Sequence, residues 1–469
     1  MSLIKSKCRE LFGVDLRSLA VFRMAVGTAV LADLAVRAFD LVVLYTDRGV
    51  LPRELLIATD GPAVRFSAHY WAGVHPPLQA GLFLFSAACA AALITGWRTR
   101  LATLACWYLV SSLQLRQPFA YYGGDSILRL MLFWGLFLPL GARFSVDSLR
   151  GRIPPRRNQH FSGATAALLL QVCFIYWATA IQKSGELWWN GQAVAYALRA
   201  DEWVTPFGTW LRDYPRLLTG LTYITLATET LGPFLAFVPV WTPGFRLLTV
   251  GLFWGFHAGL ATSMNIGLFP LFAMVAWLPF VPGALWERLH HDPSRAGTDL
   301  PDPRSAAASV TALLILTYIA LLLGQRTALL PRVLPEKVQL VGKALRVQQA
   351  WGMFAPNPFR KSSRYELRLT TANGSRRSEP AAPSVRLMHY MQRVTEPPLG
   401  AAAIRSLQYF AAYHCASWDD RGDPSQQLTR LELVKHVRPL DDAESIDLDT
   451  RVLVDSTCGR AVQGQTVRH

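Results

Sequence analysis

Over roughly its first 330 residues the chain alternates long apolar runs with short basic segments. A helix needs about 20 mostly apolar residues to cross the hydrocarbon core of a bilayer. About nine runs approach that length, near residues 18–36, 78–96, 101–117, 126–142, 163–183, 216–240, 245–263, 266–282 and 307–324. The pattern predicts an all-α polytopic membrane domain with about nine transmembrane helices.

The pattern changes in the last part of the chain, where the long apolar runs stop. Apolar and polar residues alternate in Tyr365–Thr370 and in Leu428–Lys435, as is typical of strands, and Asn373-Gly374 is a hairpin signal. We therefore predict three parts: an N-terminal segment (1–17), the transmembrane domain (18–330) and a small, β-rich α+β extramembrane C-terminal domain (331–469).

Composition agrees with a membrane protein. The chain is 51% hydrophobic and only 17% charged, which is too apolar for an ordinary soluble enzyme of 469 residues. Its net charge of +15 lies mainly in the short segments between apolar runs, with no zinc-finger spacing or basic stripe. The positive-inside rule explains that charge, so we expect a lipid bilayer as partner and no nucleic acid.

Orientation follows from the same charges. Lysines and arginines gather on the side that holds the N-terminus, which the rule places in the cytoplasm. With nine spans, the C-terminal domain lies outside, and Lys183 lies at the outer interface. Charged and aromatic residues mix in Ala193–Leu211, which predicts an interfacial helix or a re-entrant piece.

Two of the six cysteines, Cys415 and Cys458, fall in the predicted outer domain. An oxidising compartment would allow them to form a disulfide. Their spacing alone fits two free thiols equally well, so both interpretations stay open.

The most informative polar residue in the membrane region is Lys183. It ends an apolar run and is followed by Trp188 and Trp189, a composition typical of a membrane interface, where lysines anchor helices. A lysine held in a dry pocket is also a candidate base. Glu186, three residues further on, is one candidate partner for its ammonium group.

Further polar residues fall within predicted spans, where such side chains are expensive. His257 is either a proton-transfer group or a histidine that is hydrogen-bonded to a neighbouring helix. Glu229 needs a partner, for which Lys183 and His257 are candidates. Asp125 and Arg129 are four residues apart, a spacing that favours a structural ion pair.

Other motifs favour packing or are absent. The aromatic, proline-rich segment Gln349–Pro358 is predicted to pack against the membrane domain rather than to take part in chemistry. No phosphate-binding loop, zinc-protease or serine-hydrolase motif stands in a supporting context, so no metal site is predicted.

Three sites together carry a family resemblance. They are Lys183 with Trp188 and Gly191, Phe256-His257 with the segment Ile266–Phe269, and the segment Phe144–Asp147. With these, the chain resembles the HTTM group, membrane proteins related to vitamin K-dependent γ-glutamyl carboxylase. In the carboxylase the lysine is regarded as the base that deprotonates vitamin K hydroquinone.

The resemblance implies roles for particular residues. Lys183 would be the catalytic base, and His257, Glu229, Trp188 and Asp125 would form a pocket for reduced vitamin K or another quinol. Two features depart from the pattern, because Asp125 stands where the carboxylase has a histidine, and the C-terminal domain is much shorter.

The function implied is a quinol-dependent carboxylase or oxygenase that acts on a peptide or small-molecule acceptor. The alternative is a non-catalytic membrane scaffold or lipid-binding protein that keeps the HTTM fold.

Overall fold

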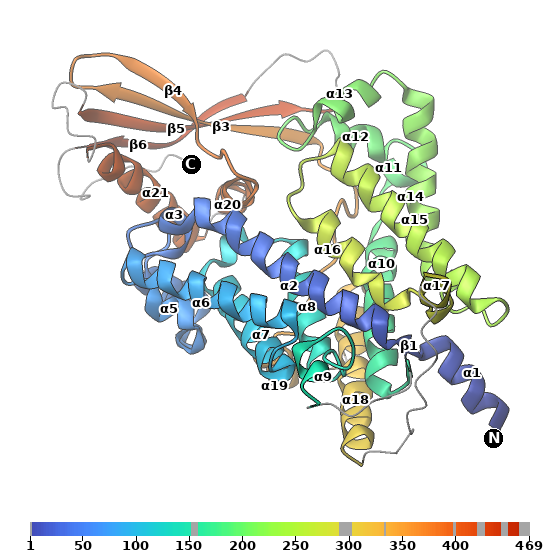
Figure 1. Cartoon of the computed structure of the whole chain (residues 1–469). Coiled ribbons are helices and arrows are strands. Elements are labelled where there is room, and N and C mark those ends of the chain that lie inside the picture. The colour runs from blue at the N-terminus through green and yellow to red at the C-terminus, as the bar shows by residue number, and fades with distance from the viewer. Residues whose placement is uncertain are drawn as a thin grey trace.

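The computed structural model describes residues 2–151, 158–289, 303–332, 334–396, 400–419, 427–441 and 449–458. Helices form one large bundle, and a sheet with two helices sits at one end of it (Figure 1). All nine predicted apolar runs are at least partly helical. The long helices are α2 (Leu16–Phe39), α6 (Pro76–Thr95), α7 (Thr99–Arg116), α8 (Gly123–Gly135), α10 (Gly163–Gln182), α14 (Pro215–Leu235), α15 (Thr242–Ser263) and α18 (Pro303–Arg326). The run at 266–282 forms α16 (Phe269–Ala276) and a 3₁₀ turn, η3 (Leu278–Phe280).

Shorter elements connect these helices. They are α1 (Ser2–Phe12), α3 (Leu41–Tyr45), α4 (Arg53–Asp60), η1 (Pro62–Phe66), α5 (Ala68–Ala72), η2 (Pro118–Ala120), α9 (Val146–Leu149), α11 (Glu186–Trp189), α12 (Ala193–Arg199), α13 (Pro206–Leu211) and α17 (Gly283–Leu289). Strand β1 (Val14–Asp15) pairs antiparallel with β2 (Gln159–His160). The region predicted as one interfacial piece is therefore two helices, and the second begins at Pro206 behind an N-cap that Thr205 provides.

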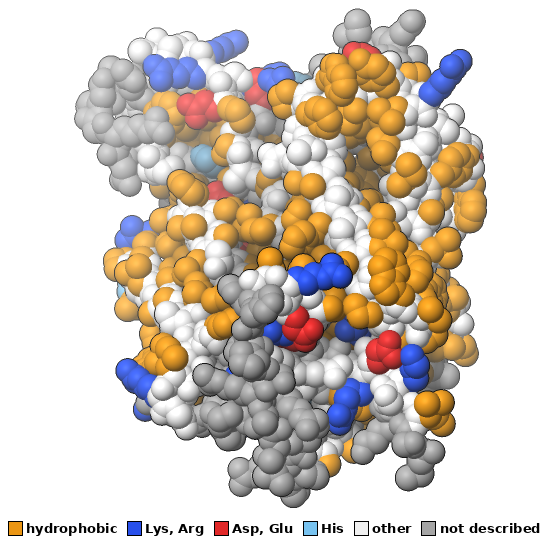
Figure 2. Space-filling model, turned by 45° about the vertical axis from the view of Figure 1, so that its right-hand side comes forward, with side chains coloured by type: hydrophobic (Ala, Val, Ile, Leu, Met, Phe, Trp, Pro, Cys, Tyr) orange, Lys and Arg blue, Asp and Glu red, His pale blue; other side chains and the backbone are white. Residues whose placement is uncertain are grey.

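Among the described residues, four helices are long and apolar enough to cross a membrane, namely α2, α6, α10 and the part of α18 from Ala306 to Arg326. A fifth span results if Phe269–Phe280 and α17, which meet at 87°, are counted as one. The predicted nine spans are not confirmed. Figure 2 nevertheless shows hydrophobic side chains over most of the middle of one face, as a bilayer requires.

The apolar runs that fail the test do so for physical reasons. α8 has only 13 residues, and nearly all of them are buried, so its hydrophobic side chains face protein rather than lipid. α14 carries Glu229, Pro233 and several threonines, and α15 carries His257 and several glycines. An apolar run therefore predicted a helix correctly but did not by itself establish a membrane span.

The C-terminal part combines a sheet with helices. The strands are β3 (Lys361–Thr371), β4 (Arg376–Pro380), β5 (Leu428–Pro439) and β6 (Asp449–Thr457), in the antiparallel order β4-β3-β5-β6. Helices α20 (Val385–Thr395) and α21 (Ala401–Asp419) lie with this sheet (Figure 1), whereas α19 (Glu336–Ala344) packs beside α18, where its Gly342 N–H donates to the Tyr318 hydroxyl at 2.9 Å. The hairpin predicted at Asn373-Gly374 joins β3 to β4, with Gly374 at a φ of +80°. Cys415 in α21 forms a disulfide with Cys458 after β6.

A buried cluster of charges fastens α20 to the bundle. Arg386 of α20 donates to Asp33 Oδ1 of α2 at 2.5 Å and to Asp125 Oδ1 of α8 at 3.1 Å. Arg37 of α2 donates to Asp33 Oδ2 at 2.7 Å and also pairs with Asp125. All four residues are at most 2% exposed, so two carboxylates balance two guanidinium groups inside the protein. We call these four residues the docking cluster.

The docking cluster corrects the predicted Asp125–Arg129 pair. Arg129 instead donates to the backbone oxygens of Arg346 at 2.6 Å and Gln348 at 2.9 Å, and to the Gln114 side chain. The four-residue spacing predicts pairs on exposed helix surfaces. Because α8 is buried, Asp125 and Arg129 take partners from other elements.

Arg386→Met tests whether the docking cluster holds the two parts together. The change leaves the Asp33 and Asp125 carboxylates facing a single guanidinium, and breaking such a buried pair costs about 3–5 kcal/mol. We expect a clearly lowered midpoint of thermal unfolding in detergent and faster proteolysis around α20. Arg377→Met, on the exposed strand β4, is the matched control and should change neither. Equal stability of both variants would contradict the role of Arg386.

Candidate functional site

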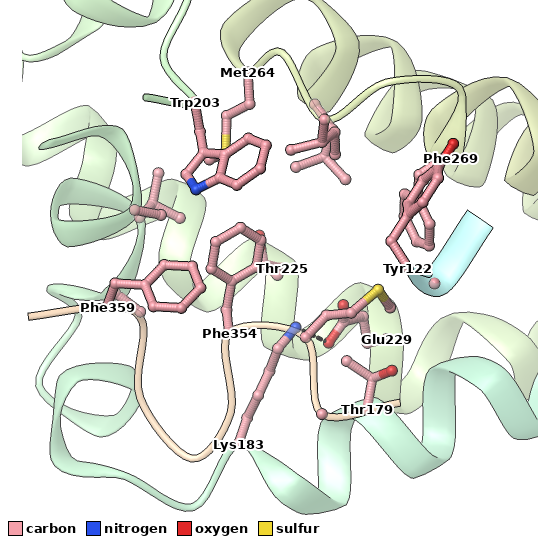
Figure 3. Close-up of a pocket in the computed structure, with 18 of the residues that line it drawn as sticks. Tyr122, Thr179, Lys183, Trp203, Thr225, Glu229, Met264, Phe269, Phe354 and Phe359 are labelled. Carbon is pink, nitrogen blue, oxygen red and sulfur yellow. Dashed lines mark hydrogen bonds and ion pairs between the residues drawn. The ribbon is translucent and has the colours of Figure 1, made fainter. Parts of the chain in front are cut away.

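A cavity of about 550 Å³ lies between the bundle and the C-terminal part. Helices α10, α12, α14 and α15 supply most of its bundle side, and the C-terminal part supplies the rest. Its lining is largely apolar and aromatic, and residues that line it include Tyr122, Ile175, Tyr176, Thr179, Trp188, Trp203, Phe256, Leu260, Met264, Phe269, Met353, Phe354 and Phe359. Figure 3 shows Lys183 and Glu229 entering this apolar space from one side. A volume of this size suits a small organic ligand.

Lys183 follows the last residue of α10 and caps the helix, its backbone N–H donating to Ala180 O at 3.1 Å. The Lys183 ammonium pairs with the carboxylate of Glu229 from α14 and lies 4.4 Å from the centre of the Trp188 ring. Lys183 is 3% exposed and Glu229 is 5% exposed. Of the two partners proposed for Glu229, the structure selects Lys183.

Glu186 is not the partner of Lys183. Its side chain is exposed and pairs with Arg360 of the C-terminal part. Residues 184 and 185 leave the end of α10 in a bend, and Glu186 begins α11, so Glu186 is not the partner of the ammonium group although it is near in sequence. Lys183 therefore lies inside the protein, whereas a simple interfacial anchor would lie at its surface.

His257 lines the cavity and is hydrogen-bonded to a neighbouring helix. Its Nε2 lies 2.8 Å from the Tyr176 hydroxyl of α10, and Trp277 Nε1 donates to the same hydroxyl at 2.9 Å. His257 is thus hydrogen-bonded to a neighbouring helix, as one of its two interpretations predicted. It also lies in the cavity wall, as the other interpretation, a proton-transfer group, requires. Nothing pairs it with Glu229, whose carboxylate is bound to Lys183.

Asp125 does not line the cavity. It belongs to the docking cluster, and its neighbour Tyr122 forms the wall instead. The guanidinium of Arg386 lies 5.0 Å from the Tyr122 ring centre, so the docking cluster contacts a residue of the cavity wall. The structure thus brings Lys183, Glu229, Trp188 and His257 to one cavity and places Asp125 one layer away.

The contribution of the C-terminal part was not predicted from the sequence. Residues 352–354 belong to the segment Gln349–Pro358, for which only packing was predicted, and they line the cavity together with Phe359. His389, Gln392, Arg393 and Glu396 line it from α20 and its C-cap. Their spacing of three or four residues places them on one helix face, which is the signal that was available in the sequence. The described residues contain no group of histidine, cysteine and carboxylate side chains that would hold a metal ion.

The fold and the site define an integral membrane protein with a helical bundle, a cavity that contains a buried lysine, and an α+β C-terminal part. The chain belongs to the HTTM family, since the model of the HTTM domain matches residues 13–286. No curated protein and no solved structure matches the chain. The family match covers the whole bundle side of the cavity, including Lys183, Glu229 and His257.

Removing one partner of the Lys183–Glu229 pair should destabilise the protein more than removing both. Lys183→Met or Glu229→Leu alone leaves one buried charge without its partner, at a cost of about 3–5 kcal/mol. The double variant buries no charge, so we expect its thermal unfolding midpoint to exceed that of either single variant. Additive losses in the double variant would show that the two side chains do not interact in the membrane-embedded protein.

His389 should make stability depend on pH. Burial, with Arg386 and Arg393 nearby, lowers the pKa of His389 from 6.5 to about 4. Between these values the unfolded chain binds a proton that the folded protein does not. The folded protein therefore keeps its full stability above about pH 6.5 and loses stability as the pH falls toward 4. The loss reaches about 3 kcal/mol. Urea unfolding of His389→Phe should show a smaller decrease between pH 7 and 4.5 than the parent; an unchanged slope would mean that His389 is accessible to protons in the folded state.

Proposed function

We propose that this protein is a quinol-dependent membrane enzyme, a carboxylase or oxygenase, in which Lys183 is the base that deprotonates the quinol. The observation that carries the proposal is the Lys183–Glu229 pair, which is buried in the wall of an apolar, aromatic cavity. A quinol partitions into lipid, so a base that acts on it has to meet it in such surroundings. The resemblance of Lys183, Trp188 and Gly191 to the carboxylase pattern points to the same role.

The residues of the cavity fit a quinol. The volume of about 550 Å³ admits an aromatic head group, and the rings of Tyr122, Phe269 and Phe354 are suitable neighbours for it. Reduced vitamin K or another quinol would supply an acidic hydroxyl group and the electrons for the reaction.

Glu229 would prepare Lys183 for its role. Only a neutral amine can accept a proton, and an isolated ammonium group is costly in a dry site. Within the pair, the proton can move from Lys183 Nζ to the Glu229 carboxylate, which leaves an amine beside a carboxylic acid. Glu229 would thus store the proton while Lys183 takes one from the quinol hydroxyl. Trp188, 4.4 Å from the ammonium, would hold Lys183 in place through its ring.

His257 and the C-terminal part would define the rest of the site. The hydrogen bond to Tyr176 fixes the His257 ring against α10, so this residue would position the ligand from the part of the wall that α15 provides. The peptide or small-molecule acceptor would meet the polar face of α20, where Arg393 and Glu396 are exposed.

We propose that the C-terminal part lies on the outer side of the membrane. Labelling of Gly374→Cys with a membrane-impermeant maleimide in intact cells tests the orientation, and protection from the reagent would reverse it.

The second candidate is a non-catalytic scaffold or lipid-binding protein that keeps the HTTM fold. The observation that favours it is that Lys183 and Glu229 are buried and paired with each other, as in an ion pair that serves only stability. The same apolar cavity would then hold part of a lipid. Turnover separates the two functions, because a scaffold consumes no quinol.

Lys183→Ala decides between them. We expect purified protein in lipid nanodiscs to consume vitamin K hydroquinone, and the variant to lose about 100-fold or more of that rate, as is typical when a general base is removed. Chromatographic quantification of the quinol and its products provides the measurement. Lys343→Ala, an exposed lysine of α19, is the matched control and should keep the parent rate. Equal rates in Lys183→Ala and the parent, or no consumption by either, would favour the scaffold.

A further inference from the structure

Phe354 has a backbone conformation that a phenylalanine rarely adopts. Its φ is +56°, in the left-handed region, where a bulky side chain is strained and glycine is favoured. Such strain persists only where surrounding contacts enforce it, and it is concentrated at functional sites. Six non-glycine residues in the described part of the chain have a positive φ, and of these Phe354 is the one that lines the cavity, beside Lys183 (Figure 3).

The contacts that enforce this conformation come from the residues that follow Lys183. Trp188 Nε1 donates to Phe354 O at 2.9 Å, and the Gly185 N–H donates to Pro356 O at 3.0 Å. Asn357 Oδ1 accepts a hydrogen bond from Leu187 N at 3.0 Å. A Cβ on Gly185 would lie 2.1 Å from Asn357 Oδ1, so only glycine permits this close approach. The position of the Phe354 ring is therefore tied to that of Lys183 through a few short contacts.

The ring belongs to an aromatic wall. Phe359 contacts it at 6.2 Å between ring centres and at 71°, a T-shaped rather than a stacked arrangement. In the view of Figure 3, Phe354, Phe359 and Trp203 lie on one side of the cavity, and Tyr122 and Phe269 lie on the other. A planar ligand between these walls would meet aromatic side chains, and aromatic rings favour offset-stacked or edge-to-face contact with other rings.

We propose that Phe354 is a specificity-determining residue whose ring stacks against the planar aromatic head group of the ligand on which Lys183 acts. The inference rests on the proposed function and goes beyond it, because it assigns ligand selection to the C-terminal part of the chain. The hydrogen bonds from Trp188 and Gly185 hold this stretch of backbone so that the Phe354 ring faces the cavity.

Phe144 provides a matched control for the strain. It is a second phenylalanine with a φ of +48°, it is 53% exposed, and its carbonyl oxygen also accepts a side-chain hydrogen bond, from Arg23 Nη2 at 2.6 Å. It does not line the cavity. Glycine relieves the strain at both positions, so any difference between Phe354→Gly and Phe144→Gly reports the surroundings of the ring.

The experiment measures binding of menadione, a planar naphthoquinone, to detergent-solubilised protein by isothermal titration calorimetry, together with thermal unfolding. We expect Phe354→Gly to weaken binding about threefold to tenfold, and its unfolding midpoint to change no more than that of Phe144→Gly. Phe354→Tyr, which keeps a ring, should bind like the parent. Phe354→Leu, apolar but not planar, should bind as weakly as Phe354→Gly. Phe144→Gly should bind like the parent.

Different failures identify different errors. Parent-like binding by Phe354→Gly or by Phe354→Leu would overturn the role of the ring while leaving the proposed function intact. A midpoint for Phe354→Gly far below that of Phe144→Gly, with parent-like binding restored at lower temperature, would show that Phe354 only packs. A parent protein that binds no menadione would remove the proposed quinol site and this inference with it.

Discussion

The structure depends on a balance of buried charges between the bundle and the C-terminal part. A charge inside a protein costs several kcal/mol unless partners of opposite sign surround it. Asp33 and Arg37 of α2, Asp125 of α8 and Arg386 of α20 meet this requirement only together. Without Arg386 the two carboxylates would face a single guanidinium, so α20 supplies the positive charge that completes the cluster. Docking of α20 therefore combines this charge neutralisation with the burial of apolar side chains such as Tyr390 and Met391.

This balance also determines the shape of the site. The docked α20 places His389, Gln392 and Arg393 at the cavity, and Arg386 lies over the Tyr122 ring that forms another part of the wall. Segment 352–354 reaches the cavity from the same C-terminal part and accepts a hydrogen bond from Trp188 of α11. The family match ends at residue 286, so the family domain supplies the lysine pair while the following segments complete the enclosure. One buried charge pairing, at Lys183, therefore lies in the cavity wall, and the other, at Arg386, contacts the Tyr122 ring of that wall.

Sequence periodicity predicted local structure better than it predicted surroundings. Each apolar run became helical and the Asn373-Gly374 hairpin formed, because these features depend on residues that are close in the chain. The number of spans was not confirmed, because several of the helices that formed are too short or too polar to cross a membrane, such as α8 with 13 residues. The Asp125–Arg129 pair was wrong because spacing along one helix does not show which other elements pack against it. Lys183, Glu229 and His257 were found as costly polar residues in apolar helices, but the role of Phe354 was hidden, because neither a left-handed φ nor a contact across 166 residues has a periodic signature.

Asp125 illustrates how a departure from a family pattern can arise from packing rather than from chemistry. The resemblance to the carboxylase places a histidine at this position, which would suggest altered reactivity here. In this chain, however, Asp125 contacts Arg37 and Arg386, and with Asp33 it supplies the negative charge that neutralises both guanidinium groups. A neutral imidazole at this position would leave an uncompensated positive charge in the docking cluster, which burial strongly disfavours. The carboxylate is therefore explained by the arginine that α20 brings to the bundle.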